Sequence, residues 1–171
     1  MRGELSSSSL RAAEFKPAQT LQLSRARLHL LAPEVQRPSF APGVLRPGIL
    51  HLGCGSFHRA HQAFLTQRAV EWEYGAGRRL QCGAPPPWGI VATSLITPGI
   101  VDALAAQDGL YTVLERGCDR THATLIGSLS ELVYAPRDPA RLRRAFADPA
   151  IRLVTLTVTV KQVPTDLGDG K

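Results

Sequence analysis

The stretch that decides the fold reads Gly48-Ile49-Leu50-His51-Leu52-Gly53-Cys54-Gly55-Ser56-Phe57-His58-Arg59-Ala60-His61. A short apolar run leads directly into a Gly-x-Gly turn at Gly53 and Gly55, and a segment with helical spacing follows. This order is typical of a dinucleotide-binding strand–turn–helix. The first glycine permits the tight turn, the second leaves room for a pyrophosphate, and the amides that open the helix face the phosphates. The usual third glycine is absent and His58 stands in its place, so the spacing alone also fits an ordinary loop.

The residues that follow the turn are candidate ligand contacts. The hydroxyl or amide of Ser56, or the neighbouring Phe57, could touch a phosphate, and the alternative for Ser56 is a simple helix cap. For His58 we expect helix packing or a contact near the ligand rather than acid–base catalysis. A metal site built on His51, His58 and His61 is not expected, because His51 lies inside the expected strand and the group has no acidic or cysteine partner.

Length and composition limit the class of protein. The 171 residues are enough for one core of ordinary size, and 44% of them are hydrophobic. No apolar run approaches the roughly 18 residues that a membrane-spanning helix needs. The three cysteines, Cys54, Cys82 and Cys118, are odd in number and lack CxxC spacing, so we expect no disulfide framework and no zinc site. A reducing cytoplasm is the simpler setting.

The formal net charge of +6 comes almost entirely from arginine, because Lys16, Lys161 and Lys171 are the only lysines. The arginines are scattered along the chain instead of clustered with aromatic residues. A nucleic-acid-binding module would need a clustered basic face. We therefore expect no nucleic-acid partner and no membrane partner.

The rest of the chain alternates expected strands with expected helices. Strands are expected over 49–52, 89–94, 110–115, 124–129 and 152–159, and helices over 60–73, 98–106 and 139–146, with a helical turn near 25–31. The apolar run 89–94 and the β-branched run 152–159 both suit buried strands, and 110–115 with 124–129 could form a hairpin. The alternation predicts a Rossmann-like α/β fold with a doubly wound parallel sheet.

Further motifs connect this turn to a known family. The string Gly53-x-Gly55-x-Phe57-His58-Arg59-Ala60-His61-Gln62 resembles the mannitol dehydrogenase family, the long-chain polyol dehydrogenases that include mannitol 2-dehydrogenase and fructuronate (mannonate) reductase. Other motifs follow in the family's order: Arg46-Pro47-Gly48-Ile49, Trp88-Gly89-Ile90 with Ser94-Leu95, Asp108-Gly109-Leu110-Tyr111-Thr112, and Asp148-Pro149-Ala150 with Thr155-Leu156-Thr157-Val158-Thr159. The resemblance covers residues 21 to 161, and the form around Trp88 is closer to fructuronate reductases.

The resemblance implies a division of the chain. Family members are much longer, with a complete nucleotide domain followed by a mainly helical substrate domain. We therefore expect an N-terminal part of the nucleotide-binding domain, with an incomplete sheet and no C-terminal substrate domain. The expected parts are a disordered leader (1–20), a lead-in segment (21–47), a partial dinucleotide-binding domain (48–161) and a divergent tail (162–171).

The resemblance also implies an activity, which is hydride transfer between NAD(P) and a secondary alcohol such as mannitol, fructose, mannonate or fructuronate. The family's catalytic lysine, asparagine and histidine lie on a helix of the later domain, so the 171 residues alone are expected to be inactive. The alternative is a non-catalytic nucleotide-binding fragment or a truncated gene product.

The expected cofactor contacts are Gly53, Gly55, Ser56, Phe57, His58, Ser94, Thr159 and Lys161. Ser94 ends the second strand, where NAD-specific sites usually carry a carboxylate for the ribose 2′-OH. The run 93–97 has neither a carboxylate nor an arginine, so NAD is expected and NADP stays open. Lys161 matches the family's Thr-Val-Thr-Glu-Lys-Gly-Tyr ending, whereas Val160, Gln162 and Val163 depart from it.

Overall fold

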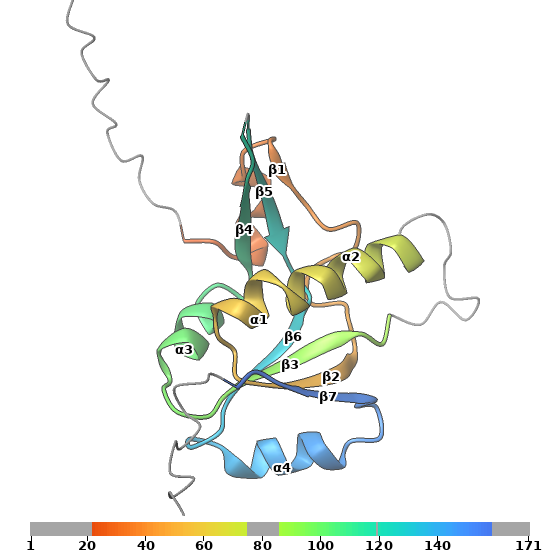
Figure 1. The fold of residues 1–171 in the computed structure, drawn as a ribbon, viewed down its shortest axis with the longest axis vertical. Helices are drawn as coiled ribbons and strands as arrows, with labels where there is room; N and C mark the ends of the chain where they lie inside the picture. The colour runs from red at the N-terminus through yellow and green to blue at the C-terminus, as the bar shows by residue number, and fades with distance from the viewer. Residues whose placement is uncertain (1–21, 75–85, 119, 159–171) are drawn as a thin grey trace, which may run out of the picture.

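The computed structural model describes residues 22–74, 86–118 and 120–158 (Figure 1). The expected leader (1–20) and tail (162–171) lie outside the described residues. The elements in chain order are η1 (Arg25–Leu30), β1 (Val35–Gln36), β2 (Pro47–Leu52), α1 (Ser56–Ala60), α2 (Gln62–Tyr74), β3 (Gly89–Ser94), α3 (Gly99–Ala105), β4 (Tyr111–Arg116), β5 (Thr121–Ile126), β6 (Leu129–Tyr134), α4 (Pro139–Ala147) and β7 (Leu153–Leu156). No helix in these described ranges is both long enough and apolar enough to cross a membrane.

The main sheet has four parallel strands in the order β6-β3-β2-β7. Successive side chains of β2 point to opposite faces of this sheet. Ile49 packs with Ala63 of α2 and Leu104 of α3, whereas Leu50 packs with Ala145 of α4. Figure 1 shows α1 and α2 on one side of the sheet and α4 on the other. This is the expected doubly wound α/β fold, with the strand order reversing between β2 and β7.

A smaller three-stranded sheet, β1-β5-β4, stands beside the first one. Its β4–β5 pair is the expected antiparallel hairpin, with Tyr111 opposite Ile126. The buried Gln67 side chain of α2 joins the hairpin to the main body, because its Nε2 donates to the Leu125 carbonyl at 2.8 Å and its Oε1 accepts from the Gly127 amide at 2.8 Å. One buried amide therefore satisfies two backbone groups where the chain leaves the hairpin.

Two predicted boundaries were wrong. The first helix begins at Ser56, directly after the glycine turn, and not at Ala60; it is interrupted at His61 (φ −116°, ψ −75°) before α2 begins. The strand predicted over 124–129 ends at Ile126, and Leu129 starts a separate strand, β6, that the sequence analysis missed. Glu131 interrupts the apolar pattern of this strand, and its carboxylate forms an ion pair with Arg141 of α4.

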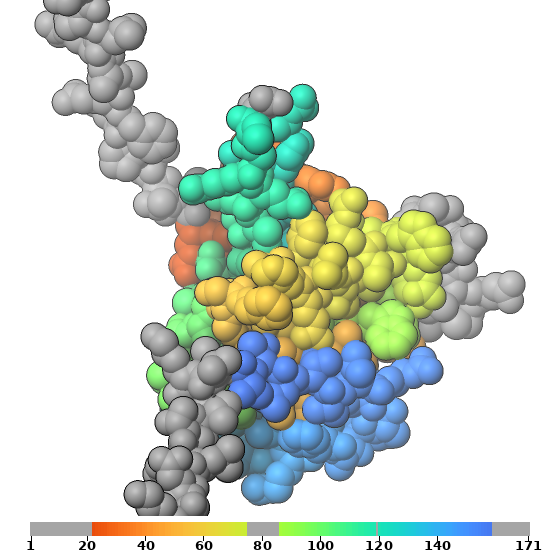
Figure 2. All heavy atoms as spheres, viewed as in Figure 1, coloured from red at the N-terminus to blue at the C-terminus, as the bar shows by residue number. Residues whose placement is uncertain are grey.

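The last predicted strand was also wrong in its burial. β7 is shorter than 152–159, and Leu153, Val154 and Leu156 are 46%, 47% and 58% exposed. Among the described residues β7 pairs only with β2, so one edge of the strand faces outward. Figure 2 shows residues 150–158, in deep blue, at the surface between α2 and α4. In contrast, β3 is buried at all six positions, as expected.

The first testable prediction concerns Gly48, the second residue of β2. A Cβ there would lie 1.7 Å from the carbonyl oxygen of Pro87, which is backbone and cannot move aside, whereas a Cβ on Gly99 meets nothing within 4 Å. Gly48→Ala should lower the free energy of unfolding by about 3 kcal/mol. The control Gly99→Ala should leave it unchanged or raise it by up to about 1 kcal/mol. Urea titrations of both variants test this, and equal stabilities would contradict it.

Candidate dinucleotide site

The glycine turn is fixed at the carboxyl end of β2. Gly53 has φ +104°, a conformation that strains any residue with a side chain, and a Cβ on it would make a tight contact, 3.3 Å, with the Thr157 carbonyl oxygen. The amides of Gly53 and Cys54 both donate to the Thr93 carbonyl of β3, at 3.0 and 2.8 Å. The turn therefore has one position relative to the neighbouring strand.

Gly55 caps the helix that follows. It is the N-cap of α1, so the Ser56 side chain is not the cap, and the Arg59 amide donates to the Gly55 carbonyl at 3.1 Å. The amides of the first helical residues, Ser56, Phe57 and His58, have no carbonyl available within the helix. A Cβ on Gly55 would have only the Gly53 carbonyl oxygen nearby, at 3.9 Å, so the space in front of this residue is open.

A crevice of about 250 Å³ lies across this turn. It is lined by Gly53, Cys54, Gly55, Ser94, Leu95, Ile96, Thr97, Ile100 and Thr157. These residues follow β2, β3 and β7 at their carboxyl ends, where the strand order reverses, and ligands of open α/β sheets bind at this place. A larger cavity of about 680 Å³ lies between η1 and β4, away from the glycine turn, so its size does not make it the better candidate.

The structure separates the expected contacts that follow the turn. Ser56 is exposed beside the crevice, and its hydroxyl accepts a long bond, 3.4 Å, from Arg59. Phe57 is 62% exposed and stacks on His61 with ring centroids 4.4 Å apart. His58 is fully buried and points to the strand behind the turn, so helix packing is the role that its position supports.

The side chain of Arg59 contacts the backbone of the turn. Its Nη1 donates to the Cys54 carbonyl at 3.0 Å, and its own carbonyl accepts from the Tyr111 hydroxyl at 2.8 Å. Burial raises the pKa of the Cys54 thiol, and the nearby guanidinium partly opposes this rise. Burial likewise raises the pKa of Tyr111, so both groups are neutral at neutral pH.

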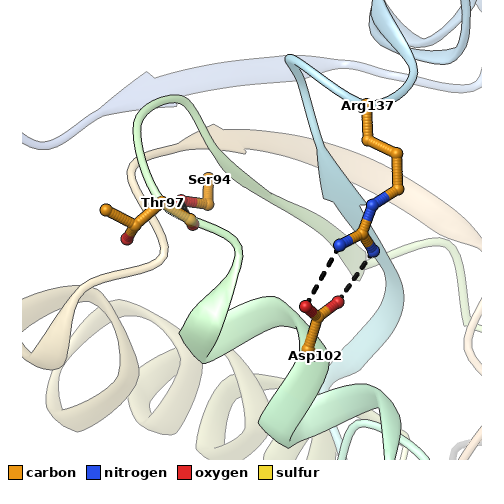
Figure 3. A network of polar contacts seen from close by, with 4 residues as sticks. All are labelled: Ser94, Thr97, Asp102 and Arg137. Carbon is orange, nitrogen blue, oxygen red and sulfur yellow. Dashed lines mark hydrogen bonds and ion pairs between the residues drawn. The ribbon is translucent and has the colours of Figure 1, made fainter.

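The loop after β3 is closed by a hydrogen bond, and an ion pair that the sequence did not reveal joins α3 to the segment after β6. Ser94 donates to the Thr97 carbonyl at 2.5 Å, which closes the loop over 94–97. At the same end of the sheet, Arg137 donates twice to Asp102, at 2.8 and 3.1 Å (Figure 3). The hydrogen bonds from Arg137 lower the pKa of Asp102. Arg137 follows β6 and Asp102 lies on α3, so only the fold brings them together.

A stacked pair of histidines lies directly beneath the turn. The rings of His51 on β2 and His58 on α1 are 3.6 Å apart between centroids and 9° from parallel, and both side chains are buried. Burial lowers the pKa of both rings. The pKa of His58 is about 4, and after burial the neighbouring His51 and Arg59 also contribute to its lowering. Two neutral rings can stack this closely without charge repulsion.

Two expected contacts, Thr159 and Lys161, lie outside the described residues. The sequence analysis missed Gln62 and Thr155, which lie beneath the turn, and the ion pair of Asp102 with Arg137. Thr155 in β7 and Thr157 directly after it are two positions apart, which could have marked them as facing one side of the sheet. Nothing in the sequence links Gln62 to Thr155, 93 positions later. Within the described ranges, no group of three or more His, Cys, Asp or Glu is placed to hold a metal.

Comparisons with known proteins agree with this geometry. The family model described as the mannitol dehydrogenase Rossmann domain matches residues 47–167. D-mannonate oxidoreductase of Escherichia coli (strain K12) is 36% identical over 142 residues, which are 80% of this chain and 27% of that protein. Mannitol 2-dehydrogenase of Aspergillus clavatus is 38% identical over 117 residues, 68% of this chain and 22% of that protein. The chain thus spans about a quarter of the length of the curated relatives it matches.

A solved structure shares the fold. The ternary complex of Pseudomonas fluorescens mannitol 2-dehydrogenase with NAD and D-mannitol superposes with a TM-score of 0.67 at 36% sequence identity. The match covers 80% of this chain and 26% of that one. The likeness therefore extends over most of this chain.

The second testable prediction concerns acid stability. The unfolded chain protonates His58 below its ordinary pKa of 6.5, whereas the folded chain does so only near pH 4. The stability linked to this group is therefore complete above pH 6.5 and is lost as the pH falls from 6.5 to about 4, by on the order of 3 kcal/mol. His58→Phe keeps a flat ring but cannot titrate, so its free energy of unfolding should fall less steeply in this range. Parallel wild-type and variant profiles in urea titrations would contradict this prediction.

Proposed function

Because this chain belongs to the mannitol dehydrogenase family, we propose that its glycine turn and the adjoining crevice bind the diphosphate and ribose of a nicotinamide dinucleotide. The observation that carries the proposal is the open space in front of Gly55, at the start of α1. Gly55 lines the crevice and is itself exposed, so its backbone is accessible to a ligand. Glycine leaves that space to a ligand, and the first helical amides, with the positive end of the helix dipole, favour an anionic one.

The remaining contacts are assigned by position. Ser56, and the amide of Phe57, would face the phosphates, while His58 supports the turn from beneath. Ser94 at the end of β3 would lie toward the adenosine ribose, where a hydroxyl suits either a 2′-OH or a 2′-phosphate. Thr159 and Lys161, which follow β7 in the sequence, would lie on the nicotinamide side.

The lining of the crevice favours NAD, because the described residues around Ser94 that line it include no arginine. A 2′-phosphate is usually held by a free arginine. Arg137 lies outside that lining, and both of its terminal nitrogens are bonded to Asp102, so its charge is compensated (Figure 3). NADP remains the alternative, because no carboxylate follows Ser94 directly.

The reaction that we propose for the whole protein is hydride transfer between this cofactor and a secondary alcohol of a polyol or sugar acid, in the class of mannitol, fructose, mannonate or fructuronate. When bound, the nicotinamide supplies the hydride acceptor or donor. The residues described here bind and orient; the proton of the alcohol needs a positioned base, which the family resemblance assigns to a lysine outside this sequence. The second candidate function is a nucleotide-binding unit without catalysis, which the same site would also serve.

The setting that we propose is a reducing cytoplasm. Cys54 and Cys118, the cysteines within the described residues, are both free thiols. A buried thiol in the middle of the phosphate-binding turn suits a compartment in which cysteines stay reduced.

The third testable prediction concerns binding. The 171-residue chain should bind NAD weakly, in the millimolar range, and the largest amide chemical-shift changes on titration should fall on Gly55, Ser56 and Phe57. Gly55→Val should abolish these changes because its side chain fills the phosphate position. Gly99→Ala, which introduces a side chain where nothing is close, should bind like the wild type. Binding that survives Gly55→Val would place the site elsewhere.

The fourth prediction concerns turnover. The 171-residue chain by itself should not oxidise mannitol or mannonate, or reduce fructose or fructuronate, with either cofactor. A positioned base contributes a factor of roughly 10² to 10⁴ in rate, and substrate orientation contributes a further proximity effect. Absorbance of reduced nicotinamide, measured with concentrated protein, tests this. Turnover that is lost in both Gly55→Val and Lys161→Ala would reveal a complete active site within these residues and overturn the expectation.

A further inference from the structure

A chain of polar side chains runs beneath the glycine turn and joins four elements. His58 Nδ1 lies 3.1 Å from Gln62 Oε1, and Gln62 Nε2 lies 2.9 Å from Thr155 Oγ1. Thr155 Oγ1 lies 2.7 Å from His51 Nδ1, and His51 Nε2 lies 3.1 Å from the Gly53 carbonyl oxygen. The chain thus passes from α1 through α2 and β7 to β2, and it ends on the backbone of the turn.

The carbonyl at the end of this chain favours one direction for its hydrogen bonds. In the opposite direction Thr157 Oγ1 would donate to His51 Nε2, and Thr155 Oγ1 would donate to Gln62 Oε1, 3.2 Å away. The Gly53 oxygen can only accept, so His51 Nε2 must carry the hydrogen, and the neutral ring has a bare Nδ1. That nitrogen accepts from the Thr155 hydroxyl, whose oxygen then accepts from Gln62 Nε2. The Gln62 oxygen is left to accept from His58 Nδ1. Each hydrogen bond of this chain then joins a donor to an acceptor with both imidazoles neutral, and His58 Nε2, which is buried without a hydrogen-bond partner among the described residues, takes no part in it.

We propose that this chain is a positioning relay: it holds His51 in the Nε2–H tautomer, and His51 in turn fixes the Gly53 carbonyl and the turn that presents the phosphate-binding amides. The contacts of Gly53 support this role. Its carbonyl also accepts from the Gly55 amide at 2.6 Å, so a shift of the carbonyl moves the N-cap of α1. The effect of the relay on ligand binding rests on the proposed dinucleotide function.

The same ring also reaches the other wall of the crevice. Thr157 Oγ1 lies 3.2 Å from His51 Nε2, and Thr157 lines the crevice together with Gly53. His51 therefore connects the ends of β2 and β7 at the place where the strand order reverses. Thr155 lies two positions earlier on the same side of β7, one layer further from the ligand. Thr155 does not line the crevice, so a change there would reach the proposed cofactor through its neighbours, of which His51 is the one bonded to the turn.

The lowered pKa values agree with this arrangement. Burial keeps both rings neutral at pH 7, so that a single tautomer is meaningful there. The charged group that acts on the pair is Arg59, which lowers the pKa of His58 and does not supply a proton to the chain. Stacking against His58 also holds the plane of the His51 ring.

Thr155 offers the test, because it can be changed without altering the shape of the site. Thr155→Val has nearly the same shape but no hydroxyl, so His51 Nδ1 loses its donor. Thr155→Ser keeps the hydroxyl and is the matched control. The tautomer of His51 is read from imidazole ¹⁵N chemical shifts in the ligand-free 171-residue chain at pH 7. Affinity is read from NAD titrations followed by amide shifts, and stability from urea unfolding.

We expect the Nε2–H tautomer in the wild type and in Thr155→Ser, and a mixture of tautomers in Thr155→Val, with shifted Gly53 and Gly55 amides. Loss of one ordering hydrogen bond should raise the Kd for NAD about fivefold in Thr155→Val and leave it within about twofold in Thr155→Ser. The free energy of unfolding of each variant shows whether a weaker affinity merely reflects a less stable fold.

Three results would overturn the relay: an Nδ1–H tautomer in the wild type, an unchanged tautomer and affinity in Thr155→Val, or equal weakening in both variants. A wild-type chain that shows the expected tautomers but binds no NAD would support the relay as the support of the turn and would instead contradict the proposed function. The tautomer measurement thus separates the two failures.

Discussion

The site depends on one backbone constraint, the sharp departure of the chain from β2 at Gly53. The residue adopts φ +104°, and a Cβ on it would lie 3.3 Å from the Thr157 carbonyl oxygen, so any residue other than glycine would be strained there. Around it, each strand end is bonded to the next: Thr157 donates to Leu52, the turn amides donate to Thr93, and Ala135 donates to Ser94. Because the parallel strands end together, one turn determines where the helix amides, the crevice and the end of β7 lie.

This arrangement explains why a histidine can occupy the middle of a buried strand. His51 would leave two ring nitrogens without partners in an ordinary core, at a cost of about 1–3 kcal/mol for each. Here Thr155, Thr157 and the Gly53 carbonyl satisfy both. The chain of polar side chains therefore stabilises the fold as well as the site. Its members come from elements that meet only when β7 has paired with β2.

The sequence could predict the parts that depend on local pattern. The glycine turn, the strand at 49–52, the buried strand at 89–94 and the hairpin follow from apolar runs, turn residues and spacing, and the structure has all of them. Contacts between distant positions were beyond it. Nothing local pairs Asp102 with Arg137, or predicts that Glu131 is tolerated in β6 because Arg141 faces it. The exposure of β7 was missed for the same reason, since β-branched composition predicts a strand but not how many neighbours it has.

The absent third glycine shows how a local departure from a fingerprint is compensated by the fold. In the usual motif that glycine lets the helix approach the strand closely. Here His58 occupies the position, and its ring lies flat against the ring of His51, so the helix–strand gap is filled by two stacked side chains. The helix is interrupted three residues later at His61, and α2 then continues over the sheet, with Ala63 in the shared core. A close glycine contact is thus replaced by a polar one, and the position of the turn comes to depend on side-chain hydrogen bonds as well as on backbone geometry.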